Sequence, residues 1–298
     1  MLLNIDTNNP KLFRKLFYQY MSNNSTLHSN YKKNNIFRIM SFNIYQWMNA
    51  IEQPNFDNQL DTIIKLNPDV FILQEVLINN SLLDNDPYIT RFIRLGYPHY
   101  IYSVDTLLDN NSNMAYGNIL FSKIPFINHQ IINTNTNTNT NNENYSCLYV
   151  ELSNNIHIFG THLEVYDSTD NSRIQQLEKI YQIINTIDSP NIILLGDLNL
   201  LYQPQLTQIQ WDYQVSHDKR RNIITSSKAY KTIINNNFID SFDYLNLSPP
   251  PISSCYDRRV DYIFIKNNFS YQCTNTQIVH TNVSDHLPIY LDLIINNK

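Results

Sequence analysis

The sequence is poor in glycine, in charged residues and in long apolar runs. These shortages limit how it can form turns, bind nucleic acid or cross a membrane. Only 4 of the 298 residues are glycine, so asparagine, which tolerates left-handed backbone angles, is expected at many turns. Charged residues make up 16% of the chain and the net charge is −5, which gives no overall basic surface for non-specific nucleic-acid binding. A protein that binds a nucleic-acid duplex would need a local basic patch or metal ions.

Cysteine is scarce, and membrane-spanning segments are lacking. Cys147, Cys255 and Cys273 are widely spaced and form no CxxC pair, so free thiols in a reducing compartment are expected. The start of the chain has no signal-peptide run, and no stretch of about 18 apolar residues is present to cross a bilayer. We therefore expect a soluble intracellular monomer, in the cytoplasm or the nucleus.

The chain is long enough for one large domain, and no Pro/Gly/Ser-rich linker divides it. Residues 1–35 are expected to be an extension with a short amphipathic helix, because Leu12, Phe13, Leu16, Phe17 and Tyr20 recur at helical spacing. Such a helix more often packs on its own domain than on a membrane surface. Since no site motif falls in residues 1–30, they are expected to be dispensable for folding, and residues 36–298 to form the domain proper.

Hydrophobic patterns predict an α/β protein in which strands and helices are layered. The stretch 201–221 is expected to be irregular, and the Thr/Asn tract at 134–142 a disordered hairpin tip, since nothing in the tract can bury a face. Strands are expected at 36–43, 69–76, 99–104, 118–122, 147–152, 156–160, 192–195 and 258–265, a loop-to-strand step at 284–291, and helices at 56–66, 88–95, 173–187 and 228–235.

The buried strand at 192–195 delivers two polar groups to its carboxyl end. Alternation along an extended chain places Asp197 and Asn199 on one face, with Leu198 pointing into the core. A carboxylate beside an amide at the mouth of an α/β core suits a metal-bound phosphate and a water. Taken alone, however, the stretch fits an ordinary strand-to-loop turn better.

Polar groups of matching chemistry follow the other predicted strands. Each has an ordinary explanation: Asn43 could cap a turn, His162 could be a hydrogen-bonded core histidine, and Asp261 could pair with Arg258 or Arg259. So many coincidences at strand ends are improbable, and a metal-assisted phosphoester hydrolase requires these very groups. The set is Asn43, Glu75, His162, Asp197, Asn199, Asp285 and His286.

The chain resembles the endonuclease/exonuclease/phosphatase superfamily, whose motifs occur here in family order over residues 36–298. The resemblance implies a four-layer α/β sandwich, in which helices flank two mixed central β-sheets as in deoxyribonuclease I, with the site at one edge. The matching motifs are Ser41-Phe-Asn43, Leu73-Gln-Glu75, Thr161-His-Leu163, Gly196-Asp-Leu-Asn199, Arg259-Val-Asp-Tyr262 and Ser284-Asp-His286.

The resemblance also implies which residues hold metal and phosphate. Glu75 would be the principal ligand of Mg²⁺, or of Mn²⁺ in its place, and Asp285 a second metal ligand. Asn43 would position that metal ligand or the phosphate, and Asn199 would hold a non-bridging phosphate oxygen.

Four residues would carry the chemical step. Asp197 would orient or deprotonate the attacking water. His286 would bind the phosphate and stabilise the developing charge, oriented by Asp261, and its pKa should be raised by that carboxylate. His162 would be a further phosphate contact or the acid that protonates the leaving group.

Two departures from the family pattern bear on the metal and the substrate. Asn43-Ile-Tyr45 stands where exonuclease III-like and tyrosyl-DNA phosphodiesterase members carry Asn-x-Asp, so one possible metal ligand is missing. The stretch Ile252-Ser-Ser-Cys-Tyr-Asp257 replaces an aromatic substrate-reading segment, and His162 stands where abasic endonucleases usually have tyrosine.

The leading functional hypothesis is a Mg²⁺-dependent phosphodiester hydrolase that acts on nucleic acid. The first alternative is a lipid or inositol phosphoesterase, acting on a phospholipid or an inositol phosphate, which a membrane-seeking N-terminal helix would favour. The second is an inactive scaffold, against which the intact motifs argue. The basic patch Lys219–Arg221 could contact phosphates or could be solvated.

Overall fold

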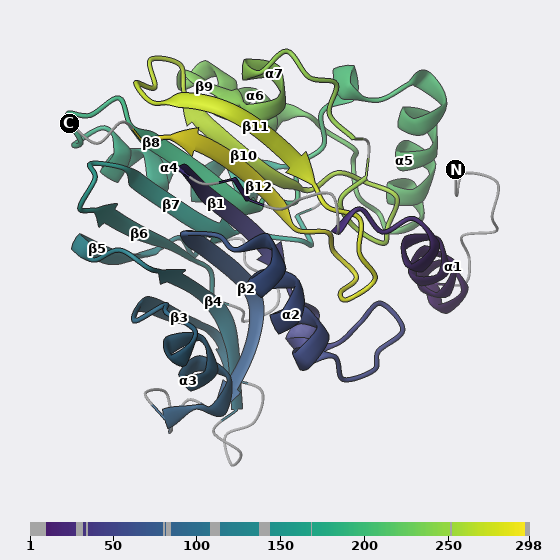
Figure 1. Cartoon of the computed structure of the whole chain (residues 1–298). Coiled ribbons are helices and arrows are strands. Elements are labelled where there is room, and N and C mark those ends of the chain that lie inside the picture. The colour runs from purple at the N-terminus through teal and green to yellow at the C-terminus, as the bar shows by residue number, and fades with distance from the viewer. Residues whose placement is uncertain are drawn as a thin grey trace.

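Two six-stranded β-sheets pack face to face in the computed structural model, and helices cover their outer faces (Figure 1). The strand orders are β11-β12-β1-β2-β4-β3 and β5-β6-β7-β8-β10-β9. Both sheets are mixed, so the predicted four-layer α/β sandwich is confirmed. The structure describes residues 10–27, 32–33, 35–79, 81, 85–107, 114–136, 144–167, 169–250 and 252–295.

In the first sheet, β1 and β2 are parallel and the other neighbours are antiparallel. β1 shows no alternation of buried and exposed residues, because the second sheet covers one of its faces and helices cover the other. Such burial on both faces is expected of a central strand. The strands are β1 (Ile36–Asn43), β2 (Val70–Asn79), β3 (His99–Leu107), β4 (Met114–Ser122), β11 (Gln272–Ile278) and β12 (Ile289–Ile294).

In the second sheet, β7 and β8 are the parallel pair, joined by the helix α4 in a strand-helix-strand unit. The predicted strand at 192–195 is the core of β8, where every residue is buried. The strands are β5 (Phe126–Asn133), β6 (Ser146–Leu152), β7 (His157–His162), β8 (Ile192–Asp197), β9 (Phe238–Asp240) and β10 (Asp261–Lys266).

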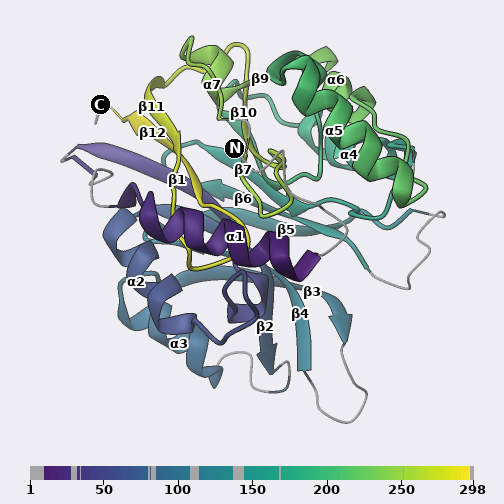
Figure 2. The ribbon, with the colours of Figure 1, turned by 90° about the vertical axis from the view of Figure 1, so that its right-hand side faces the viewer.

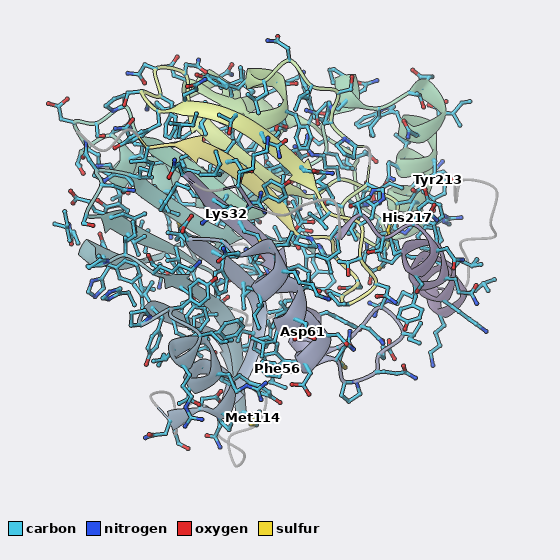
Figure 3. The ribbon with its side chains drawn as sticks, viewed as in Figure 1. Lys32, Phe56, Asp61, Met114, Tyr213 and His217 are labelled. Atoms are coloured by element: carbon cyan, nitrogen blue, oxygen red, sulfur yellow. The ribbon has the colours of Figure 1, made fainter. Side chains whose placement is uncertain are left out.

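Three apolar clusters hold the layers together. The central one lies between the sheets and includes Ile72 of β2 and Ile193 of β8. On the outside of the first sheet pack α2 (Phe56–Leu66) and α3 (Pro87–Arg94), where the partly buried ring of Phe56 contacts the rings of Trp47 and Tyr88 (Figure 3 labels Phe56). Outside the second sheet pack α4 (Asn171–Ile184) and α6 (Lys228–Asn235). The helices predicted at 56–66 and 228–235 match their observed bounds.

The N-terminal helix α1 (Pro10–Asn23) lies across one end of the sandwich (Figure 2). Its side chains Phe13, Phe17 and Met21 are buried and belong to the central cluster, so the expected packing on the domain is confirmed. A polar residue of the same helix, Arg14, reaches the cavity described below. No predicted site motif falls in residues 1–30, yet Arg14 lines the cavity and α1 packs into the core, so we expect their removal to expose part of the core.

Other predictions missed short or weakly patterned elements. The stretch after residue 200 contains a helix, α5 (Gln208–Arg220). Thr207 caps its first turn, and the side chains of Thr207 and Gln210 each hydrogen-bond to the backbone N–H of the other residue. The edge strand β5 was also missed, because its side chains are mostly exposed and show no buried alternation. Of the Thr/Asn tract, residues 137–142 lie outside the described residues.

The remaining expectations concern thiols and membranes. Cys147, Cys255 and Cys273 are free, as predicted, and all three are buried. Among the residues that the structure describes, no helix is long and apolar enough to cross a bilayer.

Candidate active site

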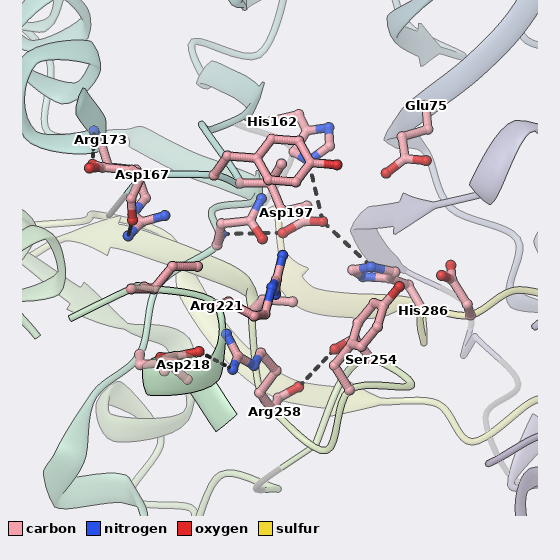
Figure 4. A pocket seen from close by; sticks show the side chains of 18 of the residues that line it. Glu75, His162, Asp167, Arg173, Asp197, Asp218, Arg221, Ser254, Arg258 and His286 are labelled. Atoms are coloured by element: carbon pink, nitrogen blue, oxygen red, sulfur yellow. Dashed lines mark hydrogen bonds and ion pairs between the residues drawn. The ribbon is translucent and has the colours of Figure 1, made fainter. Parts of the chain in front are cut away.

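The carboxyl ends of the two parallel strand pairs meet at one edge of the sandwich and surround a cavity of about 590 Å³ (Figure 4). The register explains why polar groups collect there. His162 at the end of β7 pairs with Asp197 at the end of β8, which pairs in turn with Asp261 at the start of β10. Every predicted site residue lines this cavity except Asn43 and Asp261, which are fully buried behind it.

Asp197 lies at the centre of the site, with only 2% of its surface exposed. Its Oδ2 accepts a hydrogen bond from Asn43 Nδ2 at 3.1 Å. The same oxygen lies 3.5 Å from His162 Nε2 and 3.6 Å from His286 Nε2, as the dashed lines in Figure 4 show. One carboxylate oxygen therefore faces two imidazoles at the open side of the cavity.

Gly196 allows this arrangement because of its position between β7 and β8. Its φ is +148°, and a Cβ placed on it would lie 1.8 Å from the carbonyl oxygen of Thr161. A residue with a side chain cannot occupy this position unless the two strands move apart. Glycine therefore keeps His162 and Asp197 in contact.

His286 and Asp261 form the predicted pair. His286 Nδ1 lies 2.9 Å from Asp261 Oδ2, which also accepts a hydrogen bond from Ser253 Oγ at 2.6 Å. Burial alone would lower the pKa of His286, but the carboxylates of Asp261 and Asp197 outweigh burial and hold that pKa well above its usual value. These two carboxylates therefore favour the protonated form of His286.

The arginines that could have competed for Asp261 have other partners. Arg258 Nη2 donates to Asp218 at 2.7 Å, and Arg259 donates to Asp240 at 2.7 Å. The alternative in which Asp261 forms a structural ion pair with a neighbouring arginine is therefore wrong.

Glu75 projects into the cavity because β2 is irregular at this point. The register of β2 against β4 shifts between Leu73 and Val76, and Glu75 has a φ of +54°. Its Oε1 accepts a hydrogen bond from Asn43 Nδ2 at 2.9 Å, while the side chain stays partly exposed in the cavity. Asn43 thus joins Glu75 to Asp197, and its amide contacts carboxylates.

Asp285 and Asn199 complete the predicted set. Burial raises the pKa of Asp285 to about 6, the nearby carboxylates of Glu75 and Asp197 add to the rise, and the cations His286 and Arg14 oppose it. Asn199 has a φ of +50° and donates from Nδ2 to the carbonyl oxygen of Leu163 at 2.9 Å, which fixes the amide at the cavity wall.

Several cavity residues were not predicted. Arg14 comes from α1, and its contact with Asp285 at 3.7 Å has no local sequence signal. The exposed side chains Tyr166 and Ile224 were not predicted either, whereas Arg221, which also lines the cavity, belongs to the basic patch for which phosphate contact was one of two alternatives (Figure 4 labels Arg221). In the described part of the chain, the lining holds seven carboxylates against four guanidinium groups, so an anionic substrate needs an additional cation.

The donor set fits such a cation at Glu75. Carboxylate oxygens are the ligands that hard divalent ions prefer, and Glu75 combines a fixed orientation with an oxygen open to the cavity. Possible ligand atoms of Asp197, Asp261 and His286 also lie within 4.8 Å of one another. That cluster is less suitable, since Asp261 is fully buried and His286 is hydrogen-bonded to it.

Residues 40–286 match the model of the Endonuclease/Exonuclease/phosphatase family, and the chain belongs to that family. Solved structures agree with this fold. The human Nocturnin catalytic domain with bound sulfate anion is 18% identical, with a TM-score of 0.66, over 91% of this chain and 98% of that one. Sphingomyelinase C from Streptomyces griseocarneus is 16% identical, with a TM-score of 0.56, over 86% and 99%.

A third similar structure is D. rerio TDP2 complexed with single strand DNA product, which is 15% identical with a TM-score of 0.57. It covers 87% of this chain and 98% of that one. Sequence comparison with curated proteins finds no match. Because all three solved structures are so distant in sequence, they show the shared fold and leave the substrate open; members of the family are phosphoesterase hydrolases.

Proposed function

We propose that this protein is a Mg²⁺-dependent phosphodiester hydrolase that acts on nucleic acid. The observation that carries the proposal is the environment of Asp197, whose Oδ2 faces His162 and His286 at the cavity while Asn43 joins it to Glu75. A carboxylate, two imidazoles and a separate open carboxylate are the groups that phosphoester hydrolysis requires. The inactive-scaffold alternative is disfavoured because none of these groups is missing.

Asp197 orients the attacking water and accepts its proton. Its Oδ1 accepts a hydrogen bond from the backbone N–H of Asn199 at 3.2 Å, which fixes the plane of the carboxylate. Oδ2 is then the oxygen that a water in the cavity can contact. Because Asn43 donates to this oxygen from the buried side, the carboxylate is held in one orientation.

The histidines bind and stabilise the phosphate. His286 is charged and donates through Nε2 toward the cavity, since Asp261 fixes the proton on Nδ1. Its positive charge stabilises the negative charge that develops on the phosphoryl oxygens. His162, at the end of β7, lies on the other side of Asp197 and is placed to contact the phosphate or to protonate the leaving oxygen.

A divalent ion fits beside Glu75. Bound there, Mg²⁺, or Mn²⁺ in its place, would supply Lewis acidity at a phosphoryl oxygen, typically worth several kcal/mol. The hydrogen bond from Asn43 holds the Glu75 carboxylate in place for this ion. Asn199 also lines the cavity, where its amide would hold a non-bridging oxygen.

The rim of the cavity favours a nucleotide over a lipid. Tyr166 is 50% exposed and Ile224 is 67% exposed, and both line the cavity together with Arg221. An exposed aromatic ring offers a base a stacking surface, and a guanidinium contacts a neighbouring phosphate. A membrane-seeking N-terminal helix would favour the lipid or inositol alternative, but α1 buries its apolar face in the domain.

A substrate panel tests this proposal. Single-stranded and duplex DNA, RNA, tyrosyl-linked oligonucleotides, sphingomyelin vesicles and inositol phosphates are incubated with the purified chain in Mg²⁺ and in EDTA. We expect hydrolysis of an oligonucleotide in Mg²⁺, its loss in EDTA, and its loss in Asp197→Asn. Hydrolysis of sphingomyelin or an inositol phosphate alone, with Asp197→Asn again inactive, would replace the nucleic-acid assignment with the lipid or inositol one.

A further inference from the structure

The N-terminal helix places a cation inside the candidate active site. The buried side chains Phe13 and Phe17 fix the rotation of α1, and Arg14 between them is directed to the cavity with 14% of its side chain exposed. Lys15, one residue further along the helix, is exposed. The placement of Arg14 therefore follows from the helix packing.

Arg14 is held by two tyrosines as well as by a carboxylate. Its Nη1 donates to the phenol of Tyr45, and its Nη2 donates to that of Tyr256 at 2.6 Å. The guanidinium carbon lies 4.6 Å from the ring centroid of Tyr45 and 5.6 Å from that of Tyr256. The same Nη2 lies 3.7 Å from Asp285 Oδ2, and Asp285 is buried.

Tyr45 explains why a guanidinium suits this position. It brings a neutral phenol to this side of the site and no carboxylate that could hold a metal ion. The phenol accepts the hydrogen bond of Arg14 instead. The buried carboxylate on this side, Asp285, already faces a fixed positive charge.

We propose that Arg14 is a built-in cation of the active site, which neutralises Asp285 and takes the place of a second divalent ion. The site then binds a single ion at Glu75, and the scissile phosphate meets that ion on one side and the guanidinium of Arg14 on the other. This inference rests on the proposed function. It makes α1 a part of the catalytic site, with Tyr45 and Tyr256 as residues that position the guanidinium.

The alternative is that Arg14 only fastens α1 to the domain. Its contact with Glu52 at 3.5 Å belongs to that role, since Glu52 is 53% exposed and such surface pairs contribute little. The two roles predict different results when metal binding is measured without any substrate. A fastening residue changes the stability of the chain and leaves the number of bound ions unchanged.

The test is Mn²⁺ binding to the full chain, measured by calorimetry and by electron paramagnetic resonance. The variants are Arg14→Gln and, as a matched control, Lys15→Gln, which removes the same charge from the exposed side of the helix. We expect one ion per chain in wild type and in Lys15→Gln, and a second ion in Arg14→Gln, because Asp285 is then free to bind it. Two ions in wild type, or one ion in all three proteins, would overturn the proposal.

Kinetics provides a second measurement. On the oligonucleotide found by the substrate panel, Arg14→Gln should lower kcat/KM by roughly tenfold or more at low Mn²⁺, because a charged contact to the phosphate is lost. Excess Mn²⁺ should restore part of the lost kcat/KM in Arg14→Gln. It should leave the kcat/KM of wild type and of Lys15→Gln unchanged. If no divalent ion binds even to wild type, the proposed metal-dependent hydrolase itself fails, which separates the two conclusions.

Discussion

Asp261 Oδ2 lies 2.9 Å from His286 Nδ1, and this contact connects the two sheets at the active site. Asp261 begins β10 of the second sheet, whereas His286 lies in the loop that leads into β12 of the first sheet. Ser253 donates a hydrogen bond to the same carboxylate oxygen at 2.6 Å, and this bond fixes the oxygen that faces the imidazole. The orientation of His286 thus depends on how the two sheets pack.

We predict that Asp261 and His286 act as a unit in turnover. Asp261→Asn and His286→Asn should each lower kcat by about 10² or more, since one loses the tautomer control and the other the charged donor. The double variant should lose far less than the product of the two effects. Steady-state kinetics on the three variants measures the coupling. The pair would be contradicted if the two losses of kcat multiplied in the double variant. It would also be contradicted if Asp261→Asn lowered the melting temperature but left kcat unchanged.

A second prediction concerns the metal ion. Glu75→Gln keeps the shape of the side chain and its contact with Asn43 but removes the charge that Mg²⁺ prefers, so Mg²⁺ affinity should fall by about tenfold or more. Calorimetry measures the affinity, and EDTA should abolish turnover in wild type. Glu178→Gln, an exposed substitution on α4, is the control and should bind Mg²⁺ as wild type does. Full turnover in EDTA would exclude the metal assignment.

The motifs at strand ends could be predicted from sequence because local rules fix them. An unbroken apolar run followed by glycine specifies a buried strand, and the residues two positions apart after it share a face, which placed Asp197 correctly at the cavity. The contacts between distant segments could not be predicted. Arg14 meets Asp285 only because α1 packs across the end of the sandwich, and nothing near either residue encodes that geometry.

The helix α5 shows a second limit. Exposed Gln208 and buried Gln214 are both polar, so periodicity gives no signal, and the helix is recognised only from the Thr207 cap. Gln214 is buried because its amide donates to the carbonyl oxygen of Asp257 at 2.7 Å. A polar side chain buried by a tertiary hydrogen bond is invisible to hydrophobic patterning.

Packing of α1 yields a third prediction. Phe17 is fully buried in the central cluster, so Phe17→Ala should lower the free energy of unfolding by roughly 3–5 kcal/mol. Leu12→Ala is the matched control, because 41% of Leu12 is exposed, and it should cost less than about 1 kcal/mol. Denaturant unfolding measures both. Equal stability of Phe17→Ala and wild type would mean that the helix is dispensable after all.

Acid stability should depend on Asp218, a fourth prediction. Burial would raise its pKa, but the hydrogen bonds from His217, Arg258 and Thr225 and the charge of Arg258 outweigh burial and lower the pKa to about 2. A carboxyl whose pKa is lower in the folded state contributes stability above its unfolded pKa, near 3.8, and loses that contribution as the pH falls through about 2. The contribution is roughly 2 kcal/mol at neutral pH.

The measurement is the unfolding free energy of wild type and Asp218→Asn between pH 6 and pH 2. The difference between the two should be largest above pH 4 and should shrink as the pH approaches 2. Asp57→Asn, which breaks the exposed pair with Arg91, is the control and should change stability by less than about 1 kcal/mol throughout. A difference that stays constant over the whole range would show that Asp218 contributes no pH-dependent stability.

The fifth prediction is that Gly196→Ala damages the fold and the site together. A Cβ at this position meets the carbonyl oxygen of Thr161 at 1.8 Å, and the φ of +148° is one that residues with side chains rarely adopt. β7 must then move from β8, and the contact between His162 and Asp197 across these strands is lost. We expect a loss of several kcal/mol in the free energy of unfolding and a further loss of kcat in the molecules that remain folded.

Gly96→Ala is the matched control for this change. Gly96 also has a positive φ, +94°, but nothing lies within 4 Å of a Cβ placed on it, and the turn after α3 is remote from the cavity. Its substitution should cost about 1 kcal/mol from backbone strain and leave kcat unchanged. Comparing kcat per folded molecule in the two variants separates backbone strain from the movement of β7. Wild-type turnover in folded Gly196→Ala would show that the spacing of β7 and β8 does not set the geometry of Asp197.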